Sequence, residues 1–125
     1  MPMTYTIDRA QNLVRATGTG VLTDEDVMAH RQAMAAEPLF SPQMRELSDV
    51  RQVTAFQLTP TGIRIMVAAD VKMTALGGMH KLAIVAEENV AYGMSRMYQT
   101  LGEPNIRIVG VFRSYEEAAA WLGIT

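Results

Sequence analysis

Residues 80–101 read HKLAIVAEENVAYGMSRMYQTL, and two patterns in this stretch decide the fold. The run LAIVA is continuously apolar, as in a strand of a parallel sheet that is covered on both faces. In the segment that follows, Val90, Met94, Met97 and Leu101 recur at the spacing of one helix face. A buried strand followed directly by an amphipathic helix is typical of α/β proteins. We expect these four side chains to be buried against the sheet.

Two β-rich runs near the N-terminus, residues 5–8 and 13–21, are separated by a polar turn. This pattern predicts an antiparallel hairpin. Further strands are predicted at residues 46–50, 80–86 and 106–112, which are rich in apolar and β-branched side chains. The chain therefore has enough strands for one five-stranded sheet.

A helix is predicted directly after the hairpin, because Thr23 and Asp26 have the spacing of a capping box. In such a box each of the two side chains bonds a backbone N–H that the helix itself leaves unpaired. Val27, His30 and Met34 follow at i, i+3 and i+7. This spacing predicts that they form the inner face of the helix.

Capping residues also mark two later helices. Pro60 suits the first position of a helix, where a backbone N–H would have no partner, so the second helix is expected to begin near Thr59 or Thr61. Ser114 and Glu117 have capping-box spacing at the start of the last helix.

The predicted element order is ββαβαβαβα, an α/β fold with a mixed five-stranded sheet packed by helices. The 125 residues have the length of one domain, spanning 1–125. The chain has no cysteine, a net charge of -2 and no long apolar run. These properties exclude a disulfide framework, the basic face of a nucleic-acid-binding protein and a transmembrane helix. We expect a cytoplasmic protein.

Motifs for catalysis or cofactor binding are weak. Gly18 begins a segment like a dinucleotide fingerprint, but Thr23 replaces its third glycine and is better explained as a helix cap. Ser95 follows a glycine as in a nucleophile elbow, yet it lies inside a predicted helix. The two histidines, His30 and His80, lack the spacing of paired metal ligands. We expect no enzymatic activity, no metal and no cofactor.

The ten methionines leave two interpretations open. Met73, Met79, Met94 and Met97 either line an adaptable apolar pocket or fill the core at helical spacing. Because such stripes are ordinary core faces, the second interpretation is favoured.

Binding sites in open parallel sheets form beyond the carboxyl ends of the strands. Residues 49–62, 87–89 and 113–114 follow the third, fourth and fifth predicted strands, so we expect them to meet at this edge. The candidate binding residues are Asp49, Arg51, Thr59, Thr61, Gly62 and Ser114. Thr61 is the candidate phosphoacceptor, because a helix N-terminus favours an added dianion. The alternative is that the two threonines simply cap the helix.

Several phrases occur in an order that resembles a known family: EPLF (37–40), ELSDVR (46–51), AIVA (83–86), YGMSRMY (92–98) and VFRSYEEA (111–118), with WLG at 121–123. They resemble the SpoIIAA-like proteins, bacterial domains related to STAS (sulfate transporter and anti-sigma-factor antagonist) domains. The resemblance implies a mixed five-stranded sheet packed by helices and no well-defined activity.

Anti-sigma antagonists of the STAS class use a phosphorylatable serine at the start of the second helix. The corresponding segment here is LTPTG (58–62), in which Gly62 fits the phrase, Thr61 stands for the hydroxyl and the acidic residue is absent. The resemblance implies a non-enzymatic regulatory module that acts through protein–protein contacts with a partner still to be identified. Related folds resemble the CRAL-TRIO lipid-transfer domains. The alternative is therefore a small apolar ligand or lipid bound between helices and sheet, and a homodimer is also open.

Overall fold

The computed structural model describes residues 2–41, 43–75, 81–102 and 108–124. Its elements follow the predicted order ββαβαβαβα. They are β1 (Met3–Asp8), β2 (Leu13–Thr23), α1 (Asp24–Ala36), β3 (Arg45–Gln57), α2 (Pro60–Ala75), β4 (Lys81–Val85), α3 (Asn89–Gly102), β5 (Ile108–Phe112) and α4 (Tyr115–Leu122). In the described part of the chain, no helix is long and apolar enough to cross a membrane.

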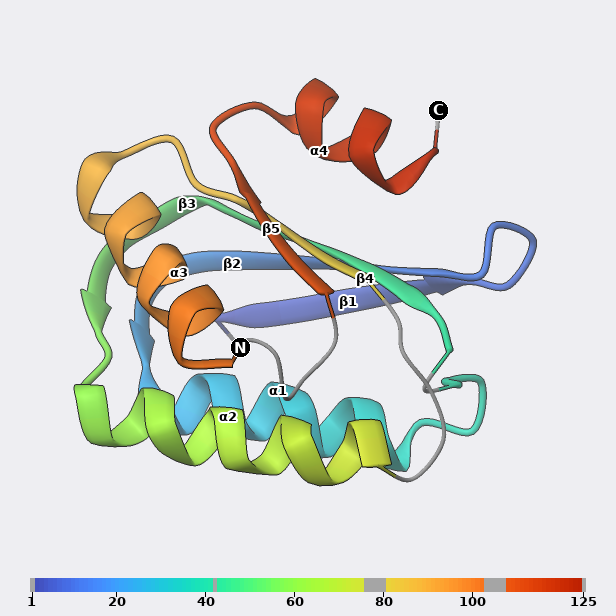
Figure 1. Ribbon diagram of the computed structural model, residues 1–125, viewed down its shortest axis with the longest axis horizontal. Coiled ribbons are helices and arrows are strands. Elements are labelled where there is room, and N and C mark those ends of the chain that lie inside the picture. Colours follow the sequence, from blue (N-terminus) through green and yellow to red (C-terminus); the bar gives the residue numbers. More distant parts are fainter. Residues whose placement is uncertain (1, 42, 76–80, 103–107, 125) are drawn as a thin grey trace.

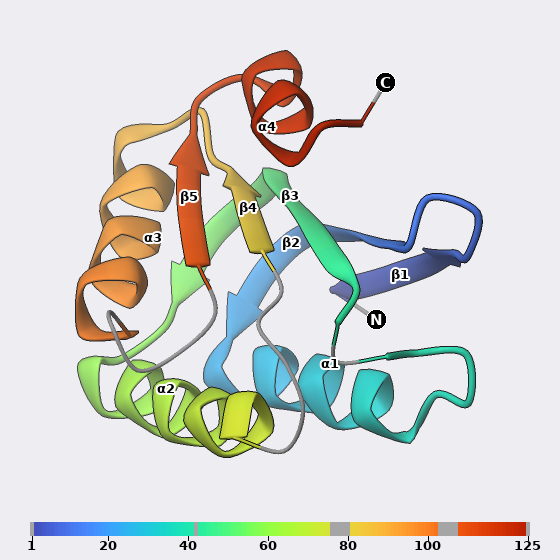
Figure 2. The same cartoon turned by 45° about the vertical axis from the view of Figure 1, so that its right-hand side comes forward.

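The five strands form one mixed sheet in the order β1-β2-β3-β4-β5. The first pair is antiparallel, as the predicted hairpin requires, and the other three pairs are parallel. Helices α1, α2 and α3 cover one face of the sheet, whereas α4 lies on the other (Figures 1 and 2). The sheet therefore separates two environments, each with its own packing.

The apolar run of β4 is buried on both faces, as its composition predicts. Successive side chains of a strand point to opposite faces. Leu82 accordingly packs in a cluster with residues of α2 and α3, while Ala83 and Val85 pack in a cluster with α4. The exposed fraction of each of these three residues is at most 3%.

The two predicted helix caps at Thr23 and Ser114 are confirmed, and a glycine ends the last helix. Thr23 caps α1 as part of a complete capping box with Asp26. Ser114 caps α4 by accepting a hydrogen bond from the backbone N–H of Glu117 at 3.1 Å. Gly123 ends α4 at a φ of 74°, in the left-handed region that favours glycine.

Strand β3 is much longer than the predicted segment 46–50. Its pairing with β4 ends where Asp49 meets Val85, but its pairing with β2 continues to Gln57. Beyond Asp49 the strand is thus supported on one side only, and most of its side chains there are exposed. This polar half carries too weak an apolar pattern to be recognised as a strand from the sequence.

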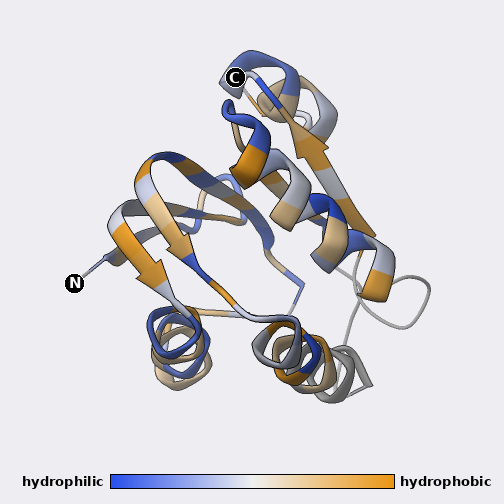
Figure 3. Cartoon of the chain, turned by 90° about the vertical axis from the view of Figure 1, so that its left-hand side faces the viewer, coloured by the Kyte–Doolittle hydropathy of each residue, from blue (hydrophilic) through white to orange (hydrophobic). Residues whose placement is uncertain are grey.

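The predicted buried face of α3 is wrong by about one position around the helix. Val90 is 66% exposed, Met97 38% and Leu101 39%, while Met94 is half-buried. Orange segments near both ends of α3 in Figure 3 mark the hydrophobic residues there. The buried side chains of the helix are instead Ala91, Ser95 and Tyr98.

Small residues explain this difference. Ala91 and Ser95 present little bulk, so α3 can lie close to its neighbours. The Ser95 hydroxyl donates a hydrogen bond to the carbonyl oxygen of Ala91 at 2.8 Å, which offsets the cost of burying it. A pattern search that scores only large apolar residues misses this face.

The observed face of α3 makes a testable prediction. Ala91→Leu places three extra carbon atoms in a packed site and should lower the free energy of unfolding by about 1–3 kcal/mol. Val90→Ser, one position away on the exposed side, should change it by less than about 0.5 kcal/mol. Urea denaturation of both variants measures these changes. A larger loss of stability in Val90→Ser than in Ala91→Leu would contradict the observed face and support the one expected from the sequence.

Candidate functional site

Five residues gather on the α4 side of the sheet, where β4 and β5 end: Asp49, Arg51, Glu87, Arg113 and Tyr115. We call them the strand-end surface. In register, Asp49 pairs with Val85 and Val85 with Phe112, so the segments that follow β4 and β5 emerge beside the middle of β3. The expectation that residues after these strands lie close together is met for these positions.

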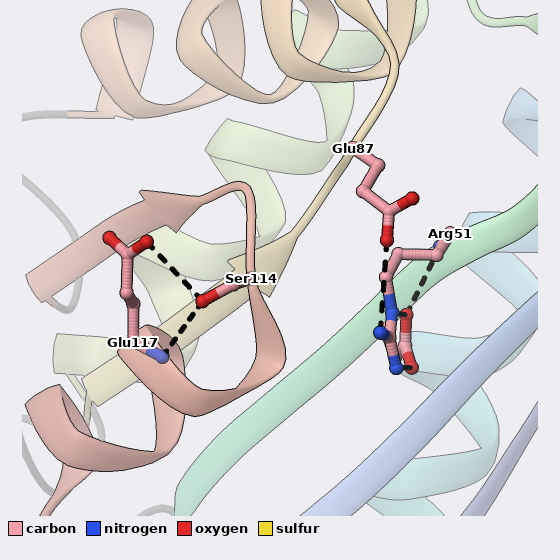
Figure 4. Close-up of polar contacts among 5 residues, drawn as sticks. Arg51, Glu87, Ser114 and Glu117 are labelled. Atoms are coloured by element: carbon pink, nitrogen blue, oxygen red, sulfur yellow. Dashed lines mark hydrogen bonds and ion pairs between the residues drawn. The ribbon is translucent and has the colours of Figure 1, made fainter.

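Arg51 is the centre of this surface (Figure 4). Its Nε and Nη2 donate to the two carboxylate oxygens of Asp49 at 2.9 and 2.8 Å, which is bidentate pairing. Its Nη1 lies 3.8 Å from the carboxylate of Glu87, and its guanidinium lies 5.6 Å from the ring centroid of Tyr115. The planar group is therefore held in one orientation by three neighbours.

The pairing changes the acidity of Asp49. Burial raises the pKa of the Asp49 carboxyl, but hydrogen bonds from the side chain and backbone of Arg51 lower it more, so the pKa lies below its ordinary value. Asp49 is accordingly ionised throughout the neutral range and keeps Arg51 in place there.

Arg113 forms a second arginine–tyrosine stack beside the first. Its guanidinium lies 4.2 Å from the ring centroid of Tyr92, and its Nη1 donates to the carbonyl oxygen of Glu87 at 2.7 Å. Both arginines thus meet Glu87, one through its side chain and the other through its backbone.

Ser114 lies at the start of α4, next to Arg113 in the chain. Its hydroxyl accepts from the backbone N–H of Glu117 and donates to the carboxylate of Glu117 at 3.3 Å (Figure 4). The structure therefore gives Ser114 a capping role, and its side chain positions α4 beside the strand-end surface.

Thr59, Thr61 and Gly62 lie elsewhere, at the N-terminus of α2. They follow the far end of β3, because that strand continues past Asp49 to Gln57. The structure consequently does not bring them together with Asp49 and Arg51.

Asp24 joins the start of α2 to the start of α1. Its carboxylate accepts from the backbone N–H of Thr59 at 3.1 Å and from the Thr59 hydroxyl at 2.7 Å. The same hydroxyl accepts from the N–H of Gly62 at 2.9 Å, so Thr59 is the cap of α2. A Cβ at Gly62 would lie 2.1 Å from the Asp24 side chain, and only glycine leaves room for this contact. Thr61 is exposed.

Asp24 is not among the candidate residues predicted from the sequence. The bond from Asp24 to Thr59 spans 35 positions and has no local signal. Asp24 thus supplies an acidic group at the start of α2, and the segment 58–62 itself contains no acidic residue.

A cavity of about 90 Å³ lies on the opposite face, between the sheet and helices α1, α2 and α3. Its wall is mostly apolar and includes Met94. Met97 is exposed instead, and the side chains of Met73 and Met79 lie outside the described part of the chain. The residues of the wall that carry polar side-chain groups are His30, Arg31, Glu46, Ser48, Ser95 and Tyr98.

His30 and Glu46 form a buried pair in this wall. The distance from His30 Nε2 to Glu46 Oε2 is 3.4 Å, and the two residues are 5% and 3% exposed. The sequence predicted that His30 faces inward, but it did not predict its carboxylate partner, because Glu46 was one polar position in a short strand. Among the described residues no group of three or more His, Cys, Asp or Glu side chains is placed to hold a metal ion, and His80 lies outside them.

Comparison with known proteins adds one result. No family model matches the chain, and no curated protein matches it. A solved structure that does match is an uncharacterized protein from the DUF3478 family with a SpoIIAA-like fold, from Shewanella loihica PV-4. The TM-score is 0.60 and the identity 18%, over 96% of this chain and 93% of that chain. At this identity the match establishes the fold: the chain has the SpoIIAA-like α/β fold that the quoted phrases predicted.

The low pKa of Asp49 makes a prediction about acid. A carboxyl whose pKa is lower in the folded than in the unfolded chain stabilises the fold above its unfolded pKa of about 4 and loses this effect as pH falls through the folded value. Asp49→Asn should therefore lower the free energy of unfolding by up to about 1 kcal/mol at pH 7, and the difference should shrink below about pH 4. Urea titrations between pH 7 and pH 3 measure it; a difference that does not change with pH contradicts the assignment.

Proposed function

We propose that this chain is a non-enzymatic regulatory module that binds a protein partner through the strand-end surface. The observation that carries the proposal is the pair of arginine–tyrosine stacks, Arg51 on Tyr115 and Arg113 on Tyr92. Arginine and tyrosine are enriched among the residues that contribute most to protein–protein affinity.

The rigidity of Arg51 supports this role. A free arginine loses side-chain entropy on binding, whereas Arg51 is already oriented by Asp49, Glu87 and Tyr115. Partly exposed ion pairs contribute little to stability, so the arrangement has small value for folding alone. Both Arg51 and Arg113 are exposed, so both cations are accessible to a partner. A partner surface that offers carboxylates or aromatic rings would complement both stacks.

The hydroxyl groups of the described site residues support a non-enzymatic role. Ser95 donates to Ala91, Thr59 donates to Asp24, and Ser114 donates to Glu117. Each hydroxyl is thus used in a structural hydrogen bond, and none of the three donates to a histidine as an activated nucleophile would. The expected cytoplasmic location belongs to this proposal as well.

Affinity capture with charge-reversed variants tests the proposal. The wild-type chain is used as bait in an extract of its own host, beside Arg51→Glu and Arg113→Glu. Arg64→Glu is the matched control, because Arg64 is exposed on α2, away from the strand-end surface. We expect a partner that wild type and Arg64→Glu retain equally, and that both surface variants bind at least about tenfold more weakly. Equal retention by all four baits would refute the proposed surface.

A phosphorylation switch at Thr61 is a second candidate, favoured by the exposure of Thr61 in the first turn of α2. Thr61 and Asp24 line the same hollow between α1 and α2, so a phosphate at Thr61 would repel the carboxylate that holds Thr59. Such repulsion would loosen the connection between the two helices.

Mass spectrometry of protein purified from its own host tests this switch. We expect a phosphate that Thr61→Ala removes. Because Thr59 is the cap, Thr61→Ala should change the free energy of unfolding by less than about 0.5 kcal/mol, whereas Thr59→Ala should lower it by about 1 kcal/mol. A chain phosphorylated at other positions only, or a large loss of stability in Thr61→Ala, would contradict the switch.

A further inference from the structure

The cavity between the sheet and helices α1–α3 differs in chemistry from the strand-end surface. Its wall combines apolar side chains with the buried His30–Glu46 pair. A mostly apolar cavity with a few convergent polar groups is the usual form of a small-molecule site. The small apolar ligand that the sequence left as an alternative would bind here.

The size of the cavity limits the ligand. A cavity of about 150 Å³ is known to accommodate benzene, which has six carbon atoms. By the same ratio a cavity of about 90 Å³ suits roughly four non-hydrogen atoms, and a fifth requires the wall to adjust. The flexible side chains of Met3, Met66 and Met94 in the wall can adjust to different shapes. A long lipid chain does not fit this volume.

His30 provides the polar contact. An ionised carboxylate only accepts hydrogen bonds, so in a pair with ionised Glu46 the imidazole carries a proton on Nε2. In the neutral ring Nδ1 is then an acceptor, and among the described residues it has no hydrogen-bond partner. A buried polar atom without a partner costs about 1–3 kcal/mol, and a donor group on a ligand would remove this cost.

The charges around the cavity favour an uncharged ligand. Arg31 and Glu46 both line the wall, and their opposite charges offset each other there. An anionic or cationic ligand would bring an unbalanced charge into an apolar site, which is costly. An uncharged molecule with one hydroxyl avoids this cost.

We propose that the cavity binds a small, uncharged, mainly apolar molecule of about four to five non-hydrogen atoms whose hydroxyl donates a hydrogen bond to Nδ1 of His30. The cavity shares no lining residue with the proposed protein contact, and the proposal is independent of it.

Isomeric probes test the ligand class. 1-Butanol and diethyl ether have the same atoms, but only the alcohol has a donor. Spectra of the protein labelled with ¹³C at the methionine methyl groups report on the site, because Met3, Met66 and Met94 line the cavity while Met34 and Met44 are buried outside it. We expect saturable shifts of the three cavity methyls only, with 1-butanol binding about fivefold more tightly than the ether and than butanoate.

Two variants locate the contact. His30→Leu should bind the alcohol and the ether within about twofold of each other, because the acceptor is gone. Met94→Phe should weaken both probes at least fivefold by filling the cavity, even if His30→Leu does not fold. Met28→Phe is the matched control, since Met28 is half-buried on α1 and does not line the cavity. It should leave both affinities unchanged.

Three results would overturn the proposal. The first is that no probe shifts the cavity methyls at millimolar concentration, in which case the cavity holds water only. The second is that the ether or butanoate binds as tightly as the alcohol. The third is that His30→Leu folds and keeps the preference for the alcohol. None of these results affects the capture experiment at the strand-end surface, so the two proposals fail separately.

Discussion

The alternation of side chains along β3, which is covered on both faces, is the constraint on which the rest of the structure depends. Successive residues of a strand point to opposite faces. Leu47 therefore packs beneath α4, while Glu46 turns toward His30 on α1. The next two residues of β3 also point to opposite faces. Ser48 lines the cavity, and Asp49 belongs to the strand-end surface. One short stretch of the chain thus contributes to both candidate sites.

The unequal length of the strands beside β3 determines how these sites are arranged. Strand β4 covers β3 only as far as Asp49, and β2 accompanies it to Gln57. The end of β4 leaves room for Arg51 to meet Glu87 and Tyr115. The continuation of β3 carries the start of α2 away from this surface and brings Thr59 to Asp24. Two groups of polar residues result, each organised by the end of a different strand.

Burial of the His30–Glu46 pair costs free energy, which other interactions in the fold must offset. Removing a carboxylate from water is unfavourable, and pairing compensates for it only where the geometry is good. A hydrophobic pair of the same size would serve packing at least as well. The two ionisable groups beside the apolar cavity are the feature on which the proposed ligand site rests, whereas the ion pairs of the strand-end surface are partly exposed.

Local patterns in the sequence were sufficient for the element order, the hairpin, the caps at Thr23 and Ser114 and the burial of β4, since each depends on neighbours along the chain. The resemblance of five short phrases was sufficient for the SpoIIAA-like fold. The tertiary structure alone decided which face of α3 is buried, because Ala91 and Ser95 are too small to register in an apolar pattern. It also decided the partners of Thr59, Arg51 and His30. Asp24, Glu87 and Glu46 reach them across the fold, and contacts between residues distant in sequence depend on strand register, which no local pattern contains.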